Sequence, residues 1–162
     1  DHVLQIAGNH DILMQTQRER VLEHMVSRLG DKFVYLEDET FTIDGINFYG
    51  SPWTPTFYNW AFMLDRGEPI KKKWEEIPED THVLITHGPR HGVFDRCDDG
   101  FLAGCEDLGH RIDALGSLRL SCFGHIHEGY GYKIKNEIEY INASICTSRY
   151  APTNKPVVIE LD

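Results

Sequence analysis

Apolar runs of strand length recur along the chain and are separated by polar or glycine-containing turns. They predict strands at residues 3–7, 33–36, 82–86, 118–123 and 157–161. Two hairpins are predicted as well, one around Asp44-Gly45 and one around Asn136. We expect the runs at 3–7 and 82–86 to be buried strands, because apolar residues fill four of the five positions in the first and the three central positions in the second.

Apolar positions with helical spacing lie between these runs. They predict helices over residues 15–29, 68–76 and about 104–115. The first carries an apolar stripe on one face and ends at Gly30. Strands that alternate with helices indicate an α/β fold, and a chain of 162 residues is the size of one domain, spanning 1–162.

Three of the predicted strands end in small turns that carry asparagine or histidine. These turns are Gly8-Asn9-His10-Asp11, His87-Gly88-Pro89 and Gly124-His125-Ile126-His127. In α/β sheets, ligands collect at the carboxyl ends of the strands. We therefore expect the side chains of the three turns to converge on one point.

The side chains in these turns suit a transition metal. Neutral imidazole and the amide oxygen of asparagine are good ligands for Mn, Fe or Zn and poor ligands for Ca. His125 and His127 alternate along an extended segment, so they serve one cluster only if the chain turns there. Gly124 and Gly129 permit such a turn, and the split suits two metal ions side by side.

Composition and charge narrow the possible partners. The chain has 26 acidic and 16 basic residues and a formal net charge of -10, which repels nucleic acid and anionic membranes at long range. A phosphate substrate remains compatible, because bound metal ions invert the local field. No apolar run is long enough to span a bilayer. Four cysteines without a C-x-x-C pair, and no secretory signal, indicate reduced thiols in a cytoplasmic protein.

In this order, the three turns resemble the later signature motifs of the calcineurin-like metallophosphoesterases. The resemblance is to the subgroup of metallophosphoesterase-domain-containing, brain protein 239-like proteins, and it is supported by residues 49–55, 86–89, 127–131 and 140–144. It implies a four-layer α/β/β/α sandwich, two divalent metal ions (Mn, Fe or Zn) and the hydrolysis of small phosphate esters. The subgroup suggests nucleotide-type phosphodiesters, such as cyclic nucleotides.

The resemblance also implies a role for each motif residue. Asn9, His87 and His125 would bind one metal ion, and His127 would bind the other. His10 would face the scissile phosphate and protonate or stabilise the leaving oxygen, with Asp11 orienting it. In the family mechanism both metals bind phosphate oxygens, and a hydroxide that bridges them attacks phosphorus.

The first two motifs of the family, Asp-x-His and Gly-Asp, are absent from this chain. We therefore expect the fold to lack its first β-α-β portion, and Asp1 lies too close to Asn9 to replace the missing bridging aspartate. Weak metal binding and little activity are expected from this polypeptide alone. The alternatives are a truncated, inactive module that binds nucleotide or metal, and a structural remnant whose exposed sheet edge associates with another chain.

Several polar and aromatic groups allow two interpretations. Arg90 and His91 could touch a substrate phosphate, although exposure to solvent is favoured for both. The aromatic residues of the segment 53–60 could stack on a nucleobase, although packing beneath a long loop is favoured; they are Trp53, Phe57, Tyr58 and Trp60. The acidic run 37–39 and the lysine run 71–73 are expected to be solvated.

Overall fold

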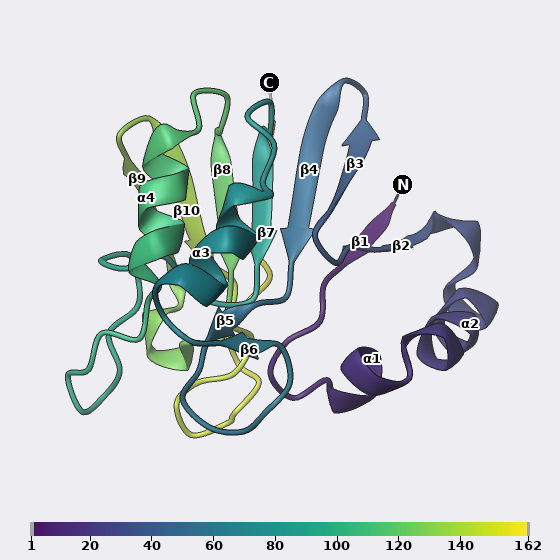
Figure 1. The fold of residues 1–162 in the computed structure, drawn as a ribbon, viewed down its shortest axis with the longest axis horizontal. Helices are drawn as coiled ribbons and strands as arrows, with labels where there is room; N and C mark the ends of the chain where they lie inside the picture. The colour runs from purple at the N-terminus through teal and green to yellow at the C-terminus, as the bar shows by residue number, and fades with distance from the viewer. Residues whose placement is uncertain (1, 162) are drawn as a thin grey trace.

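A six-stranded mixed sheet forms the centre of the computed structural model, which describes residues 2–161 (Figure 1). Asp1, which we excluded as a replacement for the bridging aspartate, lies outside the described residues. In spatial order the strands are β3 (Glu39–Ile43), β4 (Ile46–Ser51), β7 (Val83–Thr86), β8 (Leu120–Phe123), β10 (Ile138–Asn142) and β9 (Gly131–Lys135). The four inner strands are parallel to one another.

Hairpins add the two outer strands. β3 pairs with β4 and β9 pairs with β10, both antiparallel, so both predicted hairpins are confirmed. Asp44 and Gly45 have φ angles of 50° and 83°, and Asn136 has a φ angle of 52°. Asparagine, aspartate and glycine tolerate these left-handed conformations, which two-residue hairpin turns need.

Two helices cover one face of this sheet, namely α3 (Glu68–Glu75) and α4 (Glu106–Ala114) (Figure 1). Trp74 of α3 and Ile112 of α4 are buried against Leu84 and Tyr140 in the largest apolar core. Burial of side chains of this size contributes about 1.5–3 kcal/mol each. The face with the helices therefore holds the inner strands, and with them the ends of those strands, in place.

A second, two-stranded sheet lies beside the first. Its parallel strands are β1 (Val3–Gln5) and β2 (Phe33–Tyr35), connected through α1 (Ile12–Thr16), α2 (Arg18–Leu29) and the 3₁₀ turn η1 (Gly30–Lys32). The helix predicted over 15–29 is confirmed over 18–29, where α2 ends at Gly30. It is wrong at its start, because the chain breaks at Gln17, which has φ -140°. The predicted burial of the first strand is also wrong at Val3, which is 49% exposed. Within the described residues β1 has only β2 as a neighbour, so part of it stays open.

Short elements and one extended segment complete the fold. The predicted loop at 51–59 contains β5 (Thr54–Pro55), which pairs with β6 (Met63–Leu64), and η2 (His127–Gly129) follows β8. The strand predicted at 157–161 is wrong, since no strand is assigned there. Instead Val157, Ile159 and Leu161 pack against the sheet face opposite α3 and α4. Alternate side chains of an extended segment point to one side, so they cover a sheet face without strand pairing.

The predicted α/β class is confirmed, with helices on a central mixed sheet and a small parallel sheet beside it. No helix among residues 2–161 is long and apolar enough to cross a membrane.

Candidate metal centre

The three predicted turns follow β1, β7 and β8, and their side chains meet in one cavity of about 730 Å³. Asn9, His10, His87, His125 and His127 all line it. Chain turns that are far apart in the sequence thus come together at the carboxyl ends of strands, as the pattern of turns predicted.

Asn9 and His87 form the closest pair in this cavity. Asn9 is only 3% exposed, and its Oδ1 lies 2.6 Å from Nε2 of His87. The turn that places Asn9 depends on Gly8, because a Cβ atom there would lie 2.5 Å from the His87 ring. Such a contact is far closer than real Cβ atoms show, so the absence of a side chain at Gly8 makes room for the imidazole.

His125 comes to the same point from the end of β8. Its ring centroid lies 4.6 Å from that of His87. The change of direction occurs at His125 itself, which has a φ angle of 67°. The segment thus turns where a shared cluster requires it, and the residue with the left-handed conformation is His125, not the neighbouring Gly124. A left-handed conformation is unusual for histidine, and such backbone strain concentrates at functional sites.

His127 lies in η2 on another side of the cavity. Its Nδ1 is 3.1 Å from the carbonyl oxygen of Thr147, and its ring packs edge-on against Tyr150 at 5.1 Å between centroids. A carbonyl oxygen only accepts hydrogen bonds, so Nδ1 carries the proton. With the proton on Nδ1, Nε2 is the nitrogen that can bind a metal ion, as in histidines whose other nitrogen donates to a carbonyl oxygen.

Asn142, at the end of β10, holds the segment that carries both histidines. It is fully buried, and its Nδ2 donates to the carbonyl oxygen of Ile126 at 2.7 Å. Its Oδ1 accepts from the backbone N–H of Ser144 at 3.0 Å. Gly129 lets the segment pass close to its neighbour, because a Cβ there would lie 2.1 Å from the carbonyl oxygen of Phe94.

Burial keeps the central imidazoles uncharged. The pKa of His87 falls from 6.5 to about 3. Burial is the main cause, and the nearby His125 and His10 add to it. The pKa of His125 falls to about 4. Burial is again the main cause, and the nearby His127 and His10 add to it. Both rings are therefore neutral at pH 7, and a neutral ring has a lone pair to donate to a metal ion.

His10 and Asp11 occupy different places in the first turn. His10 is exposed, lines the cavity and stacks on Trp60 with 4.7 Å between ring centroids. The Asp11 carboxylate accepts from the backbone N–H of Gly8 at 2.7 Å. In this structure Asp11 thus closes the turn that presents Asn9, and its hydrogen bond goes to the backbone instead of to the His10 ring.

Arg90 is buried, which corrects the expectation that it is solvated. It is 7% exposed, and its guanidinium donates to Asp113 and to the hydroxyl of Tyr140. Arg90 is absent from the lining of the cavity and points beneath α4, where Gly109 leaves room for it. Its charge therefore joins α4 to the sheet, and we do not include it in the candidate site.

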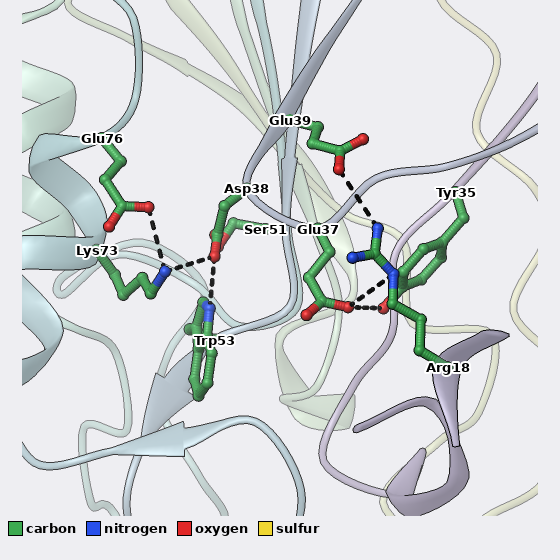
Figure 2. A network of polar contacts seen from close by, with 9 residues as sticks. All are labelled: Arg18, Tyr35, Glu37, Asp38, Glu39, Ser51, Trp53, Lys73 and Glu76. Atoms are coloured by element: carbon green, nitrogen blue, oxygen red, sulfur yellow. Dashed lines mark hydrogen bonds and ion pairs between the residues drawn. The ribbon is translucent and has the colours of Figure 1, made fainter. Parts of the chain in front are cut away.

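The expected solvation of the acidic and lysine runs is confirmed at Glu39, Lys71 and Lys72, which are exposed, but it is wrong for Asp38 and Lys73. The Asp38 carboxylate accepts from Ser51 at 2.8 Å, from the Trp53 indole at 2.8 Å and from Lys73 at 2.9 Å (Figure 2). This network joins α3 to the turn after β4. Thr54, which follows Trp53 in the chain, lines the cavity, so the network lies next to the candidate site.

The aromatic segment divides into two parts. Trp53 is partly buried against two of the apolar cores, as the packing interpretation predicts. Phe57, Tyr58 and Trp60 are 45%, 64% and 39% exposed and line the cavity, so the expectation that they pack beneath the loop is wrong.

Sequence reasoning did not identify several residues at the site. Thr54, Arg66 and Tyr150 line the cavity, and Asn142 supports it from behind. Arg66 donates to the carbonyl oxygens of residues 103 and 104. One available signal was position, since Asn142 ends a strand just as the predicted turns do. Arg66 and Tyr150 had no such signal, because they come from loops that only tertiary packing brings here.

The donor set fits one metal ion better than two. Asn9, His87 and His125 place an amide oxygen and two neutral imidazoles together, whereas His127 is the one predicted ligand for the second ion. Among residues 2–161, no three histidine, cysteine, aspartate or glutamate side chains form a group that could hold a metal ion. The family resemblance implies that further donors would come from the Asp-x-His and Gly-Asp motifs, which this chain does not contain.

Comparison with solved structures supports the fold. The chain matches the crystal structure of TT1561 of Thermus thermophilus with a TM-score of 0.54 and 13% sequence identity, over 87% of this chain and 62% of that chain. At this identity the match speaks for the fold alone. The predicted metallophosphatase-type α/β fold is confirmed.

Sequence comparison identifies the relatives. The chain is 45% identical to human metallophosphoesterase domain-containing protein 1 over 129 residues, which is 79% of this chain and 40% of that protein. It is 38% identical to the UPF0046 protein T07D4.2 of Caenorhabditis elegans, over 79% of this chain and 32% of that protein. No family profile matches the chain. The chain is a relative of the metallophosphoesterase domain-containing proteins, as its motifs predicted, and spans less than half the length of these two relatives.

Proposed function

We propose that this chain carries part of the active site of a metal-dependent phosphoesterase that cleaves small, nucleotide-type phosphodiesters. The observation that carries the proposal is the pair of buried, neutral histidines that meet Asn9 at the ends of three strands. Similarity to proteins named metallophosphoesterase supports the same chemistry. The nucleotide-type substrate rests on the resemblance to the subgroup.

Each residue has a task in this proposal. Asn9, His87 and His125 would hold one divalent ion (Mn, Fe or Zn), and His127 would contribute to the second. When bound, the two ions would supply charge for the phosphate oxygens and a bridging hydroxide as nucleophile. His10, exposed at the cavity, would donate a hydrogen bond or a proton to the leaving oxygen. Gly8 makes room for the His87 ring, and Asn142 holds the segment that carries His125 and His127.

The decisive experiment uses the full-length protein, by which we mean this chain together with any adjoining sequence that its gene encodes, loaded with Mn and assayed on a generic phosphodiester. We expect His87→Ala and His125→Ala each to lower turnover on the order of 100-fold or more, because loss of a ligand exceeds the 10- to 100-fold cost of losing a ligand's supporting partner. Metal content measured on the same samples should fall as well. His24→Ala, on the exposed surface of α2, is the matched control and should leave both unchanged. Unaltered turnover in either ligand variant would refute the assignment.

A second candidate is a module that binds metal or nucleotide without turnover. The observation that favours it is the incomplete donor set among residues 2–161. The same experiment separates the two candidates. Metal that is retained by the wild-type protein and lost in His87→Ala, with no hydrolysis in either, would support the binding module.

Two further predictions belong to this proposal. The four cysteines are free thiols, which supports a cytoplasmic location. Self-association through a sheet edge would use a strand with one open side, such as β1. Size-exclusion chromatography of this chain tests it, and a monomer at all concentrations would exclude it.

A further inference from the structure

Three aromatic side chains form a continuous surface at the mouth of the candidate site. The ring centroids of Phe57 and Tyr58 are 5.1 Å apart, those of Phe57 and Trp60 are 5.2 Å apart, and those of Tyr58 and Trp60 are 5.4 Å apart. Every ring thus contacts both others. We call this cluster the aromatic platform. The contacts order three large side chains that the sequence alone places in a loop.

The aromatic platform is continuous with the histidines. Trp60 stacks on His10 at 4.7 Å between ring centroids, and Phe57 lies 5.5 Å from His125. All three platform residues line the same cavity as Asn9 and His87. A group bound on the platform is therefore a neighbour of a group bound at the candidate metal centre.

The exposure of these rings needs an explanation. A cluster of large apolar side chains left open to water costs free energy, and such patches mark binding sites. Trp53, a few residues earlier, shows that the same segment can place an aromatic ring against the apolar cores, where it is partly buried. The platform residues remain 39–64% exposed inside a cavity, so their rings are available to a ligand.

The chemistry of the lining specifies the ligand class. The charged residues that line the cavity are Arg66 and Glu128. Arg66 already donates to two carbonyl oxygens. A ligand portion above the platform would therefore be recognised by ring contacts more than by charge. Tilted and edge-on rings bind planar aromatic groups by stacking, and such stacking tolerates different ring types.

We propose that Phe57, Tyr58 and Trp60 bind the planar ring of a phosphoester whose phosphate occupies the histidine site. The substrates are then esters that carry an aromatic ring, either a nucleobase or a simple aryl group. This inference rests on the proposed function, because it assigns the phosphate to the histidine site. Tyr58 is the cleanest residue to test, because its ring contacts are with the platform and not with a histidine.

The test compares esters with and without a ring in the full-length, Mn-loaded protein. We expect Tyr58→Ala to raise KM roughly tenfold for a cyclic nucleotide and for bis(4-nitrophenyl) phosphate, with kcat little changed, since base stacking on an aromatic side chain has about this worth. KM for the ring-free diester dimethyl phosphate should stay the same. Trp60→Phe should retain most of the affinity, because it keeps a ring next to His10.

Tyr132→Ala provides the matched control, since Tyr132 is an exposed aromatic residue of β9 that does not line the cavity. An equal rise in KM for all three esters, or none for either ring-bearing ester, would overturn the platform. A rise confined to the nucleotide would assign the ring as a nucleobase, and one confined to the nitrophenyl ester would assign it as a simple aryl group.

Direct binding separates failure of the platform from failure of the proposed function. Titration of tryptophan fluorescence with AMP, phenyl phosphate and ribose 5-phosphate needs no turnover. One outcome is that the ring-bearing compounds quench the fluorescence, that Tyr58→Ala weakens this quenching, and that the protein hydrolyses no ester. This outcome would support the aromatic platform and refute the proposed hydrolase. Hydrolysis with identical affinity for ring-bearing and ring-free compounds would support the proposed hydrolase and refute the aromatic platform.

Discussion

The two halves of the candidate metal centre differ in how completely this chain builds them. In one half, Asn9, His87 and His125 come from three separate turns, and their side chains touch or nearly touch. In the other half His127 is the one predicted ligand, oriented by Thr147 and Tyr150. Nevertheless, both halves are supported by specific hydrogen bonds or close packing.

This difference shows that supporting contacts and ligand number are separate properties. His127 has the proton arrangement of a metal-binding histidine even though the described residues around it offer no complete ligand group. Local contacts can therefore orient a candidate metal-binding side chain independently of how many other ligands surround it. Variants that change one half at a time test whether the halves act separately.

The largest effect is expected from removing His127. In the full-length protein with metal, His127→Ala should lower turnover on the order of 100-fold or more. It should release one of two bound ions while the ion held by Asn9, His87 and His125 remains, because those donors are untouched. Metal content per chain is the measurement. Loss of both ions together would show that the two halves are one cooperative unit.

A side chain at Gly8 should damage the first half only. Gly8→Val places atoms where the His87 ring lies, and overpacking of this kind costs about 1–3 kcal/mol. Denaturant unfolding should show this loss, and metal affinity of the first half should fall with it. Gly116→Ala is the matched control, since a Cβ there meets nothing within 4 Å. Equal stability of the two variants would contradict the close approach of Gly8 to His87.

Asn142→Asp should loosen the segment that carries both histidines. Aspartate keeps the shape and can still accept from Ser144, but it loses the donor to the carbonyl oxygen of Ile126. An unmade buried hydrogen bond costs about 1–3 kcal/mol. Thermal unfolding and metal affinity at both halves report the change. A decrease in the affinity of only one ion would mean that Asn142 supports one histidine and not the segment.

The smallest effect is expected at Asp113, which does not line the cavity. The Arg90 guanidinium lowers the pKa of the Asp113 carboxyl, so the folded state binds this proton more weakly than the unfolded chain does. The stabilisation is present above an unfolded pKa of about 3.9 and is lost as pH falls through the folded value. Because the carboxylate is half exposed, Asp113→Asn should cost only about 1 kcal/mol at pH 7.

The pH dependence of that cost is the check. The difference in unfolding free energy between wild type and Asp113→Asn should shrink as pH falls below the unfolded pKa of about 3.9. It should be smallest below the lowered pKa of folded Asp113, where the side chains of both proteins are neutral. A difference that is constant with pH would show that the Arg90–Asp113 ion pair does not contribute. Metal affinity should not change in this variant, which sets it apart from the others.

Much of the fold followed from local pattern. The hairpins at Asp44-Gly45 and Asn136 and the helix that begins near Pro69 depend on turn chemistry and periodicity, which are written in neighbouring residues. The errors lie where a distant partner decides. The segment 157–161 has the alternation of a strand, yet it covers a sheet face without pairing. Its apolar side chains are satisfied by burial alone.

The candidate site divides in the same way. The order of the motifs and the residue types at Asn9, His87 and His125 pointed to a metal site, and their meeting at strand ends followed from the α/β pattern. The turn at His125, the burial of Arg90 and the exposure of the aromatic platform were decided by tertiary structure. Sequence specifies which groups can donate, accept or stack. Which of them face a cavity, an ion-pair partner or the core depends on packing between segments far apart in the chain.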